Sequence, residues 1–271
     1  MSAVTPRGGA GPDFTDGHNL PPAPPDFYSR KYFLGRCGGF AEFQAVGGKV
    51  ADPIRRMALE LVAPQRGERV LDLGCGRGEL CCAIAEAGAM CVGVDFSRDA
   101  LAMARETARR LGQTVCLVRA RAEALPIRPG ALDAVLATDI VEHLPDPDLR
   151  RTVREVHDTL KPGGRFLVHT APTLEFMAVG QHVKRVLQWL ARQPVAPRLT
   201  LESELREAGH SNIHSRRSLR GALASAFPAP RVIYTFSDRG RLTRRLAAML
   251  GLVAVLGFNL WAVARRPERT A

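Results

Sequence analysis

Residues Val70 to Gly78 read Val-Leu-Asp-Leu-Gly-Cys-Gly-Arg-Gly, an apolar run that stops at an acid and then passes into alternating glycines. The apolar side chains of this run suit a buried parallel strand. The three glycines allow a sharp turn and a close approach of the backbone to a ligand that a Cβ atom would exclude. The stretch therefore predicts a ligand site at the carboxyl end of a central strand.

The spacing of the glycines indicates which kind of ligand this is. A dinucleotide site has the pattern Gly-x-Gly-x-x-Gly, but counting from Gly74 puts Glu79 at the position of the third glycine. A carboxylate there would repel a diphosphate. No lysine followed by serine or threonine comes after the glycines, which argues against a nucleoside triphosphate loop. The loop therefore favours a nucleoside without phosphates over a nicotinamide dinucleotide.

A second apolar run, from Met90 to Asp95, also ends in an acid. The carboxyl ends of neighbouring parallel strands lie at one edge of a sheet, so Asp95 is expected beside the glycine loop. Its two carboxylate oxygens can accept hydrogen bonds from both hydroxyls of a ribose.

Five motifs in order resemble those of class I S-adenosylmethionine-dependent methyltransferases, over about Val70 to His169. They are Val70 to Gly78, Gly93-Val94-Asp95-Phe96-Ser97, Ala122-Glu123-Ala124-Leu125-Pro126, Asp139-Ile140-Val141-Glu142-His143-Leu144 and Leu160-Lys161-Pro162-Gly163-Gly164. The resemblance implies an α/β, Rossmann-like fold: a mostly parallel seven-stranded sheet with helices on both faces and an antiparallel last strand.

The chain divides into a catalytic core with decorations. We expect a disordered Pro- and Gly-rich tail at 1–25, an N-terminal helical lid at 26–66, a cofactor-binding core at 67–170, a helical acceptor-binding cover at 171–230 and a strand-helix-strand unit at 231–271. The expected strands are Arg69–Leu73, Met90–Asp95, Thr114–Val118, Leu132–Ala137, Arg165–Val168, Arg231–Phe236 and Leu260–Ala264. The expected helices are Pro53–Val62, Glu79–Ala87, one capped by Ser97, Asp148–Leu160, Thr200–Ala208, Ser218–Ala226 and Arg241–Leu256, with a mixed helical insertion over Thr173–Gln193.

By resemblance, the cofactor is S-adenosylmethionine and the product S-adenosylhomocysteine. The carboxylate of Asp72 and the glycine loop would hold the aminocarboxypropyl arm, Asp95 the ribose, and Phe96 the adenine. Arg121 stands where similar enzymes often carry an Asp, and an arginine cannot accept the adenine amino hydrogen. The cofactor-binding residues implied are Tyr28, Tyr32, Asp72, Gly74, Cys75, Gly76, Asp95, Phe96, Ala122, Glu123 and Thr138, and no metal is expected.

The catalytic candidates are His143 and Asp139, which follow the fourth expected strand. Histidine is the natural base near neutral pH for removing a proton from a hydroxyl, although a histidine that only caps the next turn fits the sequence equally well. Asp139 would align the acceptor or the methionine ammonium. Further candidates are His169, at the end of the fifth strand, and His210 with Asn212 in the cover.

The expected function is methyl transfer by in-line displacement to a small molecule, with a hydroxyl oxygen as the first choice of acceptor atom. Quinones, glycans and secondary metabolites are the acceptor classes considered. The alternatives are a C- or N-methyltransferase of the same fold and a non-catalytic regulator that binds the cofactor.

Composition and charge bear on partners and location. The net charge of +11 is spread over many segments, and aromatic residues make up only 6%, so nucleic acid is not expected as the substrate. The six cysteines show no paired metal spacing and indicate a reducing compartment, the cytoplasm. Contact with a membrane surface is open for the Arg241 to Leu256 helix, because about nineteen residues from Leu246 carry no charge. The sequence does not define an oligomeric state.

Overall fold

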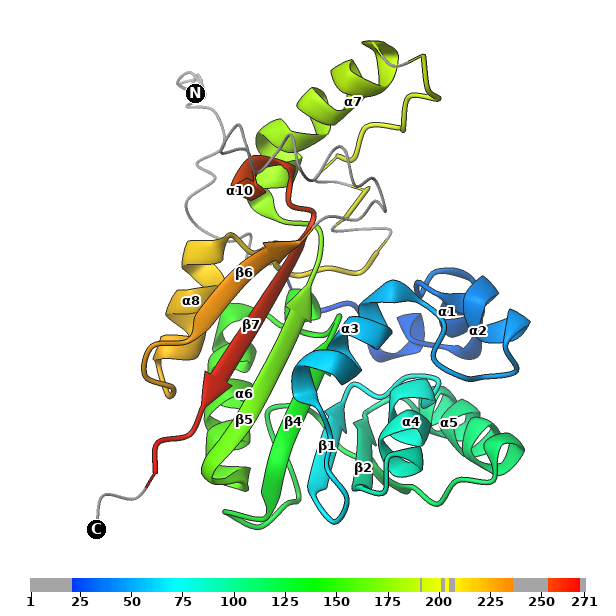
Figure 1. Ribbon diagram of the computed structural model, residues 1–271, viewed down its shortest axis with the longest axis vertical. Coiled ribbons are helices and arrows are strands. Elements are labelled where there is room, and N and C mark those ends of the chain that lie inside the picture. The colour runs from blue at the N-terminus through cyan, green and yellow to red at the C-terminus, as the bar shows by residue number, and fades with distance from the viewer. Residues whose placement is uncertain (1–20, 191, 201–202, 205–207, 236–252, 269–271) are drawn as a thin grey trace, which may run out of the picture.

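The computed structural model describes residues 21–190, 192–200, 203–204, 208–235 and 253–268. The strands are β1 (Arg69–Leu73), β2 (Met90–Asp95), β3 (Cys116–Arg119), β4 (Leu132–Thr138), β5 (Leu160–Thr170), β6 (Arg231–Thr235) and β7 (Asn259–Arg265). They form one seven-stranded sheet in the order β3-β2-β1-β4-β5-β7-β6 (Figure 1). The first five strands are parallel, and β7 is antiparallel to both β5 and β6. The predicted fold class is confirmed.

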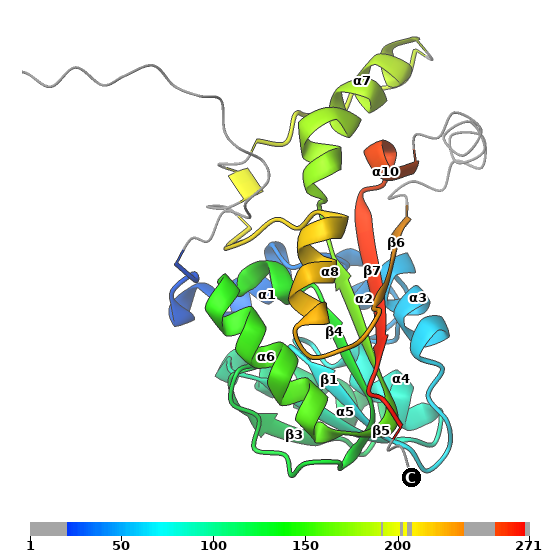
Figure 2. The same cartoon turned by 90° about the vertical axis from the view of Figure 1, so that its left-hand side faces the viewer.

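Helices cover both faces of this sheet. They are α1 (Arg30–Gly35), α2 (Phe40–Ala45), α3 (Pro53–Val62), α4 (Glu79–Glu86), α5 (Arg98–Leu111), α6 (Asp146–Thr159), α7 (Gln181–Leu190), α8 (Arg216–Ala224) and α10 (Val253–Leu256), with short turns η1 (Pro25–Phe27), η2 (Val141–His143) and η3 (Phe176–Gly180). Helices α3 and α4 pack on one face, and α6 and α8 on the other (Figure 2).

The alternation of side chains along the central strands explains the two layers. Val70 packs with Ala58 of α3 and Leu80 of α4, whereas its neighbour Leu71 belongs to the cluster that contains Val153 of α6. Both residues are fully buried. A strand covered on both faces therefore needs apolar residues at successive positions, which is the pattern that the sequence shows.

Most predicted elements are found within a residue or two of their expected bounds, and the larger differences have local causes. Strand β5 begins at Leu160 rather than at Arg165, because Leu160 pairs with Leu132 before the register shifts at a bulge. Helix α6 begins at Asp146 rather than at Asp148, because a proline in the first helical turn needs no hydrogen-bond acceptor.

Two predicted helices lie largely outside the described residues. Of the Thr200–Ala208 helix only part is described, and of the Arg241–Leu256 helix only Val253–Leu256, which forms α10. The question of membrane contact by the Arg241–Leu256 helix therefore concerns residues that are mostly outside the described part of the chain. Among the residues that are described, no helix combines the length and the apolar character needed to cross a bilayer.

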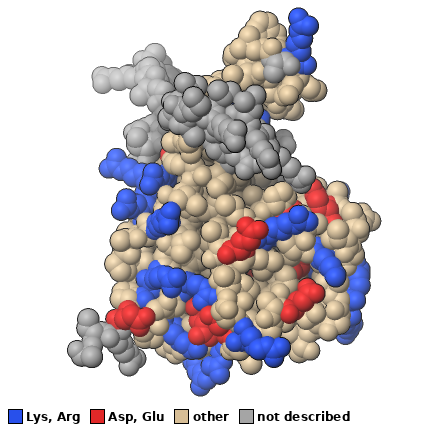
Figure 3. Space-filling model, viewed as in Figure 1, with Lys and Arg blue, Asp and Glu red and all other residues tan. Residues whose placement is uncertain are grey.

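Charged side chains of both signs are interspersed over the body of the molecule on the face seen in Figure 3. This distribution agrees with the scattered positions of the arginines in the sequence.

A close approach of α4 to α5 yields a test of the packing. Gly78 has φ +81°, and a Cβ built on it would lie 2.8 Å from the Cα of Ala104. Gly112 ends α5 with φ +65° and open space around it. Both glycines adopt the left-handed conformation, so an added Cβ strains the backbone equally at the two positions. The two substitutions therefore differ only in the steric overlap with Ala104 that Gly78→Ala creates. We expect Gly78→Ala to lower the free energy of unfolding in urea by about 1–3 kcal/mol more than Gly112→Ala does. Equal losses would contradict the close packing of these two helices.

Candidate functional site

A cavity of about 370 Å³ lies at the carboxyl ends of the parallel strands. Its walls come from the loops after β1, β2, β3 and β4, from the segment before α3, and from residues on either side of Gly209. Of the predicted site residues, it is lined by Tyr28, Tyr32, Gly74, Asp95, Phe96, Ala122, Glu123, Thr138, Asp139 and His143. The cavity thus gathers residues that lie far apart in the sequence.

The glycine loop is fastened to the end of β2. The amides of Gly74 and Cys75 donate hydrogen bonds to the carbonyl of Val94, at 2.8 and 3.0 Å. The amide of Gly76 donates to Oδ2 of Asp95 at 3.1 Å. The loop and the carboxylate predicted to hold the ribose therefore form one unit.

Asp95 is buried but keeps hydrogen-bonding capacity toward the cavity that it lines. Its second oxygen, Oδ1, accepts from the amide of Ser97 at 2.9 Å. Burial raises the pKa of Asp95 to about 6, against the lowering effect of these backbone hydrogen bonds. Each oxygen has a further lone pair, so the carboxylate can still accept two hydroxyl groups.

Asp72 lies beneath the loop rather than on the cavity wall. Its Oδ2 accepts a hydrogen bond from the thiol of Cys81 at 3.2 Å, and its buried Oδ1 has no partner among the described residues. Burial raises the pKa of Asp72 to about 7. An orphaned oxygen next to a glycine loop is a place where a polar ligand group can bind, but neither Asp72 nor its buried neighbour Cys75 borders the cavity. Their contact with a cofactor stays a prediction.

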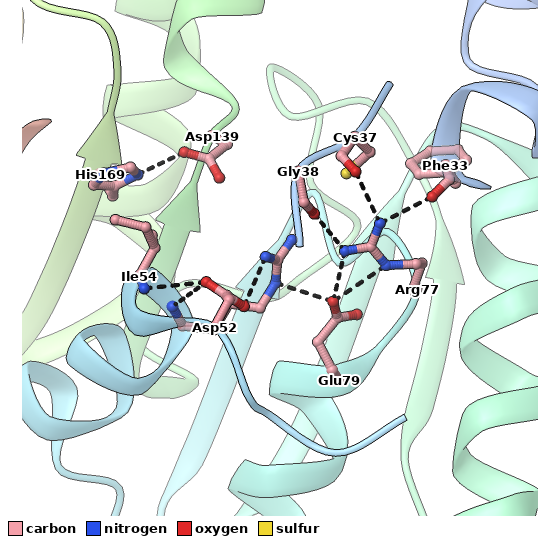
Figure 4. Close-up of polar contacts among 10 residues, drawn as sticks. Phe33, Cys37, Gly38, Asp52, Ile54, Arg77, Glu79, Asp139 and His169 are labelled. Carbon is pink, nitrogen blue, oxygen red and sulfur yellow. Dashed lines mark hydrogen bonds and ion pairs between the residues drawn. The ribbon is translucent and has the colours of Figure 1, made fainter. Parts of the chain in front are cut away.

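Arg77, in the middle of the glycine loop, anchors the N-terminal segment (Figure 4). Its buried guanidinium donates to the backbone carbonyls of Phe33, Cys37 and Gly38, at 2.9, 3.2 and 2.6 Å. The same group lies over the ring of Phe43, 5.2 Å from its centroid. One side chain thereby holds α1, α2 and the turn between them on the loop.

Glu79 balances the charge of this arginine. Its Oε1 lies 3.0 Å from Arg77 and 3.1 Å from Arg55, and Arg55 also pairs with Asp52 at 3.0 Å (Figure 4). Sequence reasoning treated Glu79 as a free carboxylate that would repel a diphosphate. In the structure this carboxylate is buried and paired with two arginines, so its charge is compensated.

Tyr28 closes one side of the cavity. Its ring meets those of Phe96, Tyr32 and His143 edge-on, with centroids 5.1 to 5.6 Å apart. Its hydroxyl lies 3.0 Å from Nδ1 of His143, and its carbonyl accepts from the hydroxyl of Ser97 at 2.7 Å. The N-terminal segment therefore spans the ends of β2 and β4.

His143 belongs to a compact polar cluster with Glu142 and His210. Nδ1 of His143 lies 3.0 Å from the carbonyl of Gly209, which can only accept, and 3.0 Å from the hydroxyl of Tyr28, which can accept or donate. The carbonyl favours the tautomer with the proton on Nδ1 and the lone pair on Nε2. Burial lowers the pKa of His143 to about 4. Oε2 of Glu142 is buried without a partner among the described residues, and burial together with Asp139 raises its pKa well above the ordinary range.

Asp139 has φ +55° and contacts β5 through its side chain. Its Oδ1 lies 2.5 Å from Nδ1 of His169, and Nε2 of His169 lies 3.2 Å from Oδ1 of Asn259. Burial opposes ionisation of Asp139, but the charge and hydrogen bond of His169 prevail and lower its pKa. The predicted residue Asp139 is thus joined to His169, while Asn212 instead donates to the carbonyl of Leu144 at 2.6 Å and fastens the cover.

The two residues predicted to contact the adenine edge, Ala122 and Glu123, lie on the cavity wall. The carboxylate of Glu123 pairs with the guanidinium of Arg121. Arg121, which stands where similar enzymes often carry an Asp, therefore lies beside Glu123.

Residues 70–164 match a family model described as a methyltransferase domain. A ubiquinone biosynthesis O-methyltransferase from Ralstonia nicotianae is 39% identical over 120 residues, which make up 44% of this chain and 50% of that protein. The residues matched by the family model are those of the sheet and loops that carry the glycine loop and Asp95, so this part of the chain is similar to methyltransferase domains. The chain spans about half the length of the curated relatives that it matches.

Solved structures share the fold of this chain. The cyclase SpnF has a TM-score of 0.61 at 19% identity, covering 92% of this chain and 99% of its own. A phosphoethanolamine N-methyltransferase 2 from Haemonchus contortus has a TM-score of 0.57 at 18% identity, covering 89% of this chain and 60% of its own. At such identities the likeness concerns the fold alone.

The sequence did not reveal the network around Arg77 or the contact of Asn259 with His169. The Arg-x-Glu spacing in the glycine loop and the Asp52–Arg55 pair at the start of α3 were the available signals. Neither signal shows that the two pairs meet, because they lie in different segments.

Substitution of Arg77 tests the anchoring of the N-terminal segment. Arg77→Met leaves one buried and two partly buried carbonyls and one side of Glu79 unpaired, and we expect a loss of about 3–5 kcal/mol in the free energy of unfolding. Hydrogen exchange at residues 30–45 should accelerate. Arg30→Met is the control, because Arg30 forms an exposed pair with Glu106 and its loss should change neither measurement. Equal behaviour of the two variants would refute the anchoring role.

Proposed function

We propose that this chain is an S-adenosylmethionine-dependent methyltransferase that acts on a hydroxyl group of a small molecule. The observation that carries the proposal is the unit formed by Asp95, the glycine loop and Phe96 on the wall of one cavity. The name of the relatives, ubiquinone biosynthesis O-methyltransferase, supports an oxygen acceptor.

The residues present fit this donor. Asp95 would accept the ribose hydroxyls, Phe96 would lie against the adenine, and the backbone of the glycine loop would hold the aminocarboxypropyl arm near Asp72. Tyr28 and Tyr32 would close the cavity and exclude water. The bound donor supplies a methyl group on a positively charged sulfur.

The chain itself mainly has to align the acceptor with that methyl group and to receive a proton. His143 lines the cavity with Nε2 free and is neutral over the physiological pH range, since its pKa lies near 4. A base this weak suits an acidic hydroxyl such as a phenol, with a pKa of about 10, better than a sugar alcohol. This favours a quinone-like phenol over a glycan.

Residues 171–230 would form the acceptor-binding cover, because Ala171, Ala208 and His210 lie on the cavity wall. The six free cysteines support a reducing compartment such as the cytoplasm. A non-catalytic or different activity remains the second candidate, since the cyclase SpnF shares the fold.

Asp95 provides the test of the donor site. We expect Asp95→Asn to weaken binding of S-adenosylmethionine, measured calorimetrically at pH 7, by at least about tenfold, because hydrogen bonds to a charged acceptor are lost. Since ribose hydroxyls prefer the ionised carboxylate and its pKa is about 6, wild-type affinity should also fall about tenfold from pH 7 to pH 5. Asp148→Asn on α6, outside the cavity, is the control. Undiminished binding by Asp95→Asn would sink the donor assignment.

His143 provides the test of proton transfer. We expect His143→Ala to lower turnover of a catechol acceptor by about a hundredfold or more, with donor affinity little changed. Because burial depresses the pKa of His143, the acidic limb of kcat/KM for the acceptor, measured at saturating donor, should lie near 4 rather than near the ordinary histidine value. Tyr28→Phe, which removes only the hydroxyl beside Nδ1, serves as the comparison. A loss of only a few fold in His143→Ala would mean that positioning alone suffices.

A further inference from the structure

The end of η3, helix α7 and the segment after it, residues 179–198, form an arm that projects from the body of the molecule (Figures 1 and 2). The arm exposes large apolar side chains: Val179, Val186, Leu187, Trp189, Leu190 and Val195. Trp189 is 69% exposed and Leu190 is 64% exposed, whereas the other tryptophan of the chain, Trp261, is completely buried. A cluster of this kind, unlike single exposed residues, marks a contact surface.

The spacing places these side chains together. Val179, Val186 and Leu190 are seven and four residues apart, which puts them on one face of a continuous helical path, and Trp189 adjoins them. Since these side chains are 50 to 69% exposed, packing within the described residues does not account for them.

Side-chain hydrogen bonds hold the segment after α7 against this helix. Gln181 donates from Nε2 to the carbonyl of Leu199 at 3.0 Å and accepts from its amide at 2.9 Å. Further along, Oε1 of Gln188 accepts from the amide of Ala196 at 3.1 Å. These bonds tie residues 196–199 back along α7, so the apolar face is presented by a supported helix.

The charge of the arm indicates what this face meets. Residues 176–200 contain Lys184, Arg185, Arg192 and Arg198 and no acidic residue. In Figure 3 the visible side of the arm is mostly uncharged with basic side chains at its tip, in contrast to the mixed charges below. An apolar face that carries a tryptophan, on a segment whose charged residues are all basic, complements an anionic lipid surface.

We propose that the arm, residues 179–198, docks on the surface of a membrane that contains anionic phospholipid. Trp189, Leu190 and Val186 enter the interface, and the basic residues meet the headgroups. Helix α7 has 10 residues and is about 15 Å long, half the thickness of a bilayer core, so it lies at the surface and does not cross. The arm begins eight residues after Ala171 of the cavity wall, so the docked surface and the cavity are close in the chain.

The experiment is co-sedimentation of the full chain with vesicles. We expect pelleting with phosphatidylcholine vesicles that contain phosphatidylglycerol, and little with phosphatidylcholine alone. The double variant Trp189→Ser, Leu190→Ser should lower the partition coefficient at least about tenfold. Met90→Ser is the matched control, because Met90 is an apolar residue that is 60% exposed at the start of β2, and it should pellet as the wild type does.

A second variant separates charge from apolar contact. Arg192→Gln with Arg198→Gln should weaken binding to the anionic vesicles and leave folding, followed by circular dichroism, unchanged. Equal pelleting of the wild type and the Trp189, Leu190 variant would overturn the proposal. So would sedimentation equilibrium that shows a dimer which this variant dissociates, because the arm would then bind a second copy of the chain. Vesicle binding needs no methyl donor, so failure here leaves the donor assignment untouched.

Discussion

The buried guanidinium of Arg77 is the contact that joins the two halves of the cavity wall. It extends from the glycine loop to three backbone carbonyls of the N-terminal segment, and its charge is balanced by Glu79, which Arg55 of α3 also contacts. A buried charge of this kind is stable only when it is fully paired. The requirement fixes the segment that carries Tyr28 over the end of β2, because carbonyls placed elsewhere would leave the guanidinium unsatisfied.

The fold was predictable because its local and long-range patterns agree. Successive apolar residues in β1 and β4 belong to strands covered on both faces, and the glycines after β1 occupy conformations with positive φ. The observed ends of a strand differ from the predicted ends where pairing with a neighbouring strand determines them. The early start of β5 depends on the pairing of Leu160 with Leu132, and the short β3 depends on where it meets β2. Neither pairing can be predicted from the sequence of the strand alone, because its partner lies elsewhere in the chain.

The site was predictable to the extent that parallel strands end at one edge. Asp95 and His143 each follow a strand, so the topology brings them to the same cavity whatever the details of packing. Contacts across the sheet were not predictable in this way. Asn259 in β7 bonds to His169 in β5 because the two strands pair antiparallel, and in the sequence Asn259 only interrupts an apolar run. The depth of Asp72 below the cavity likewise depends on how tightly the loop folds over it.

Three titratable groups in the loop after β4, Asp139, Glu142 and His143, have pKa values shifted in different ways. His169 holds Asp139 in its ionised form, while burial and the nearby charge of Asp139 keep Glu142 protonated. Groups whose environments push their pKa values apart take different chemical roles. An anion that is already paired is a poor proton acceptor, and a carboxylic acid that holds its proton can only donate it. Burial lowers the pKa of His143 and keeps its imidazole neutral, which supports the proposal that His143, among the groups of this loop, receives the proton of an acceptor hydroxyl.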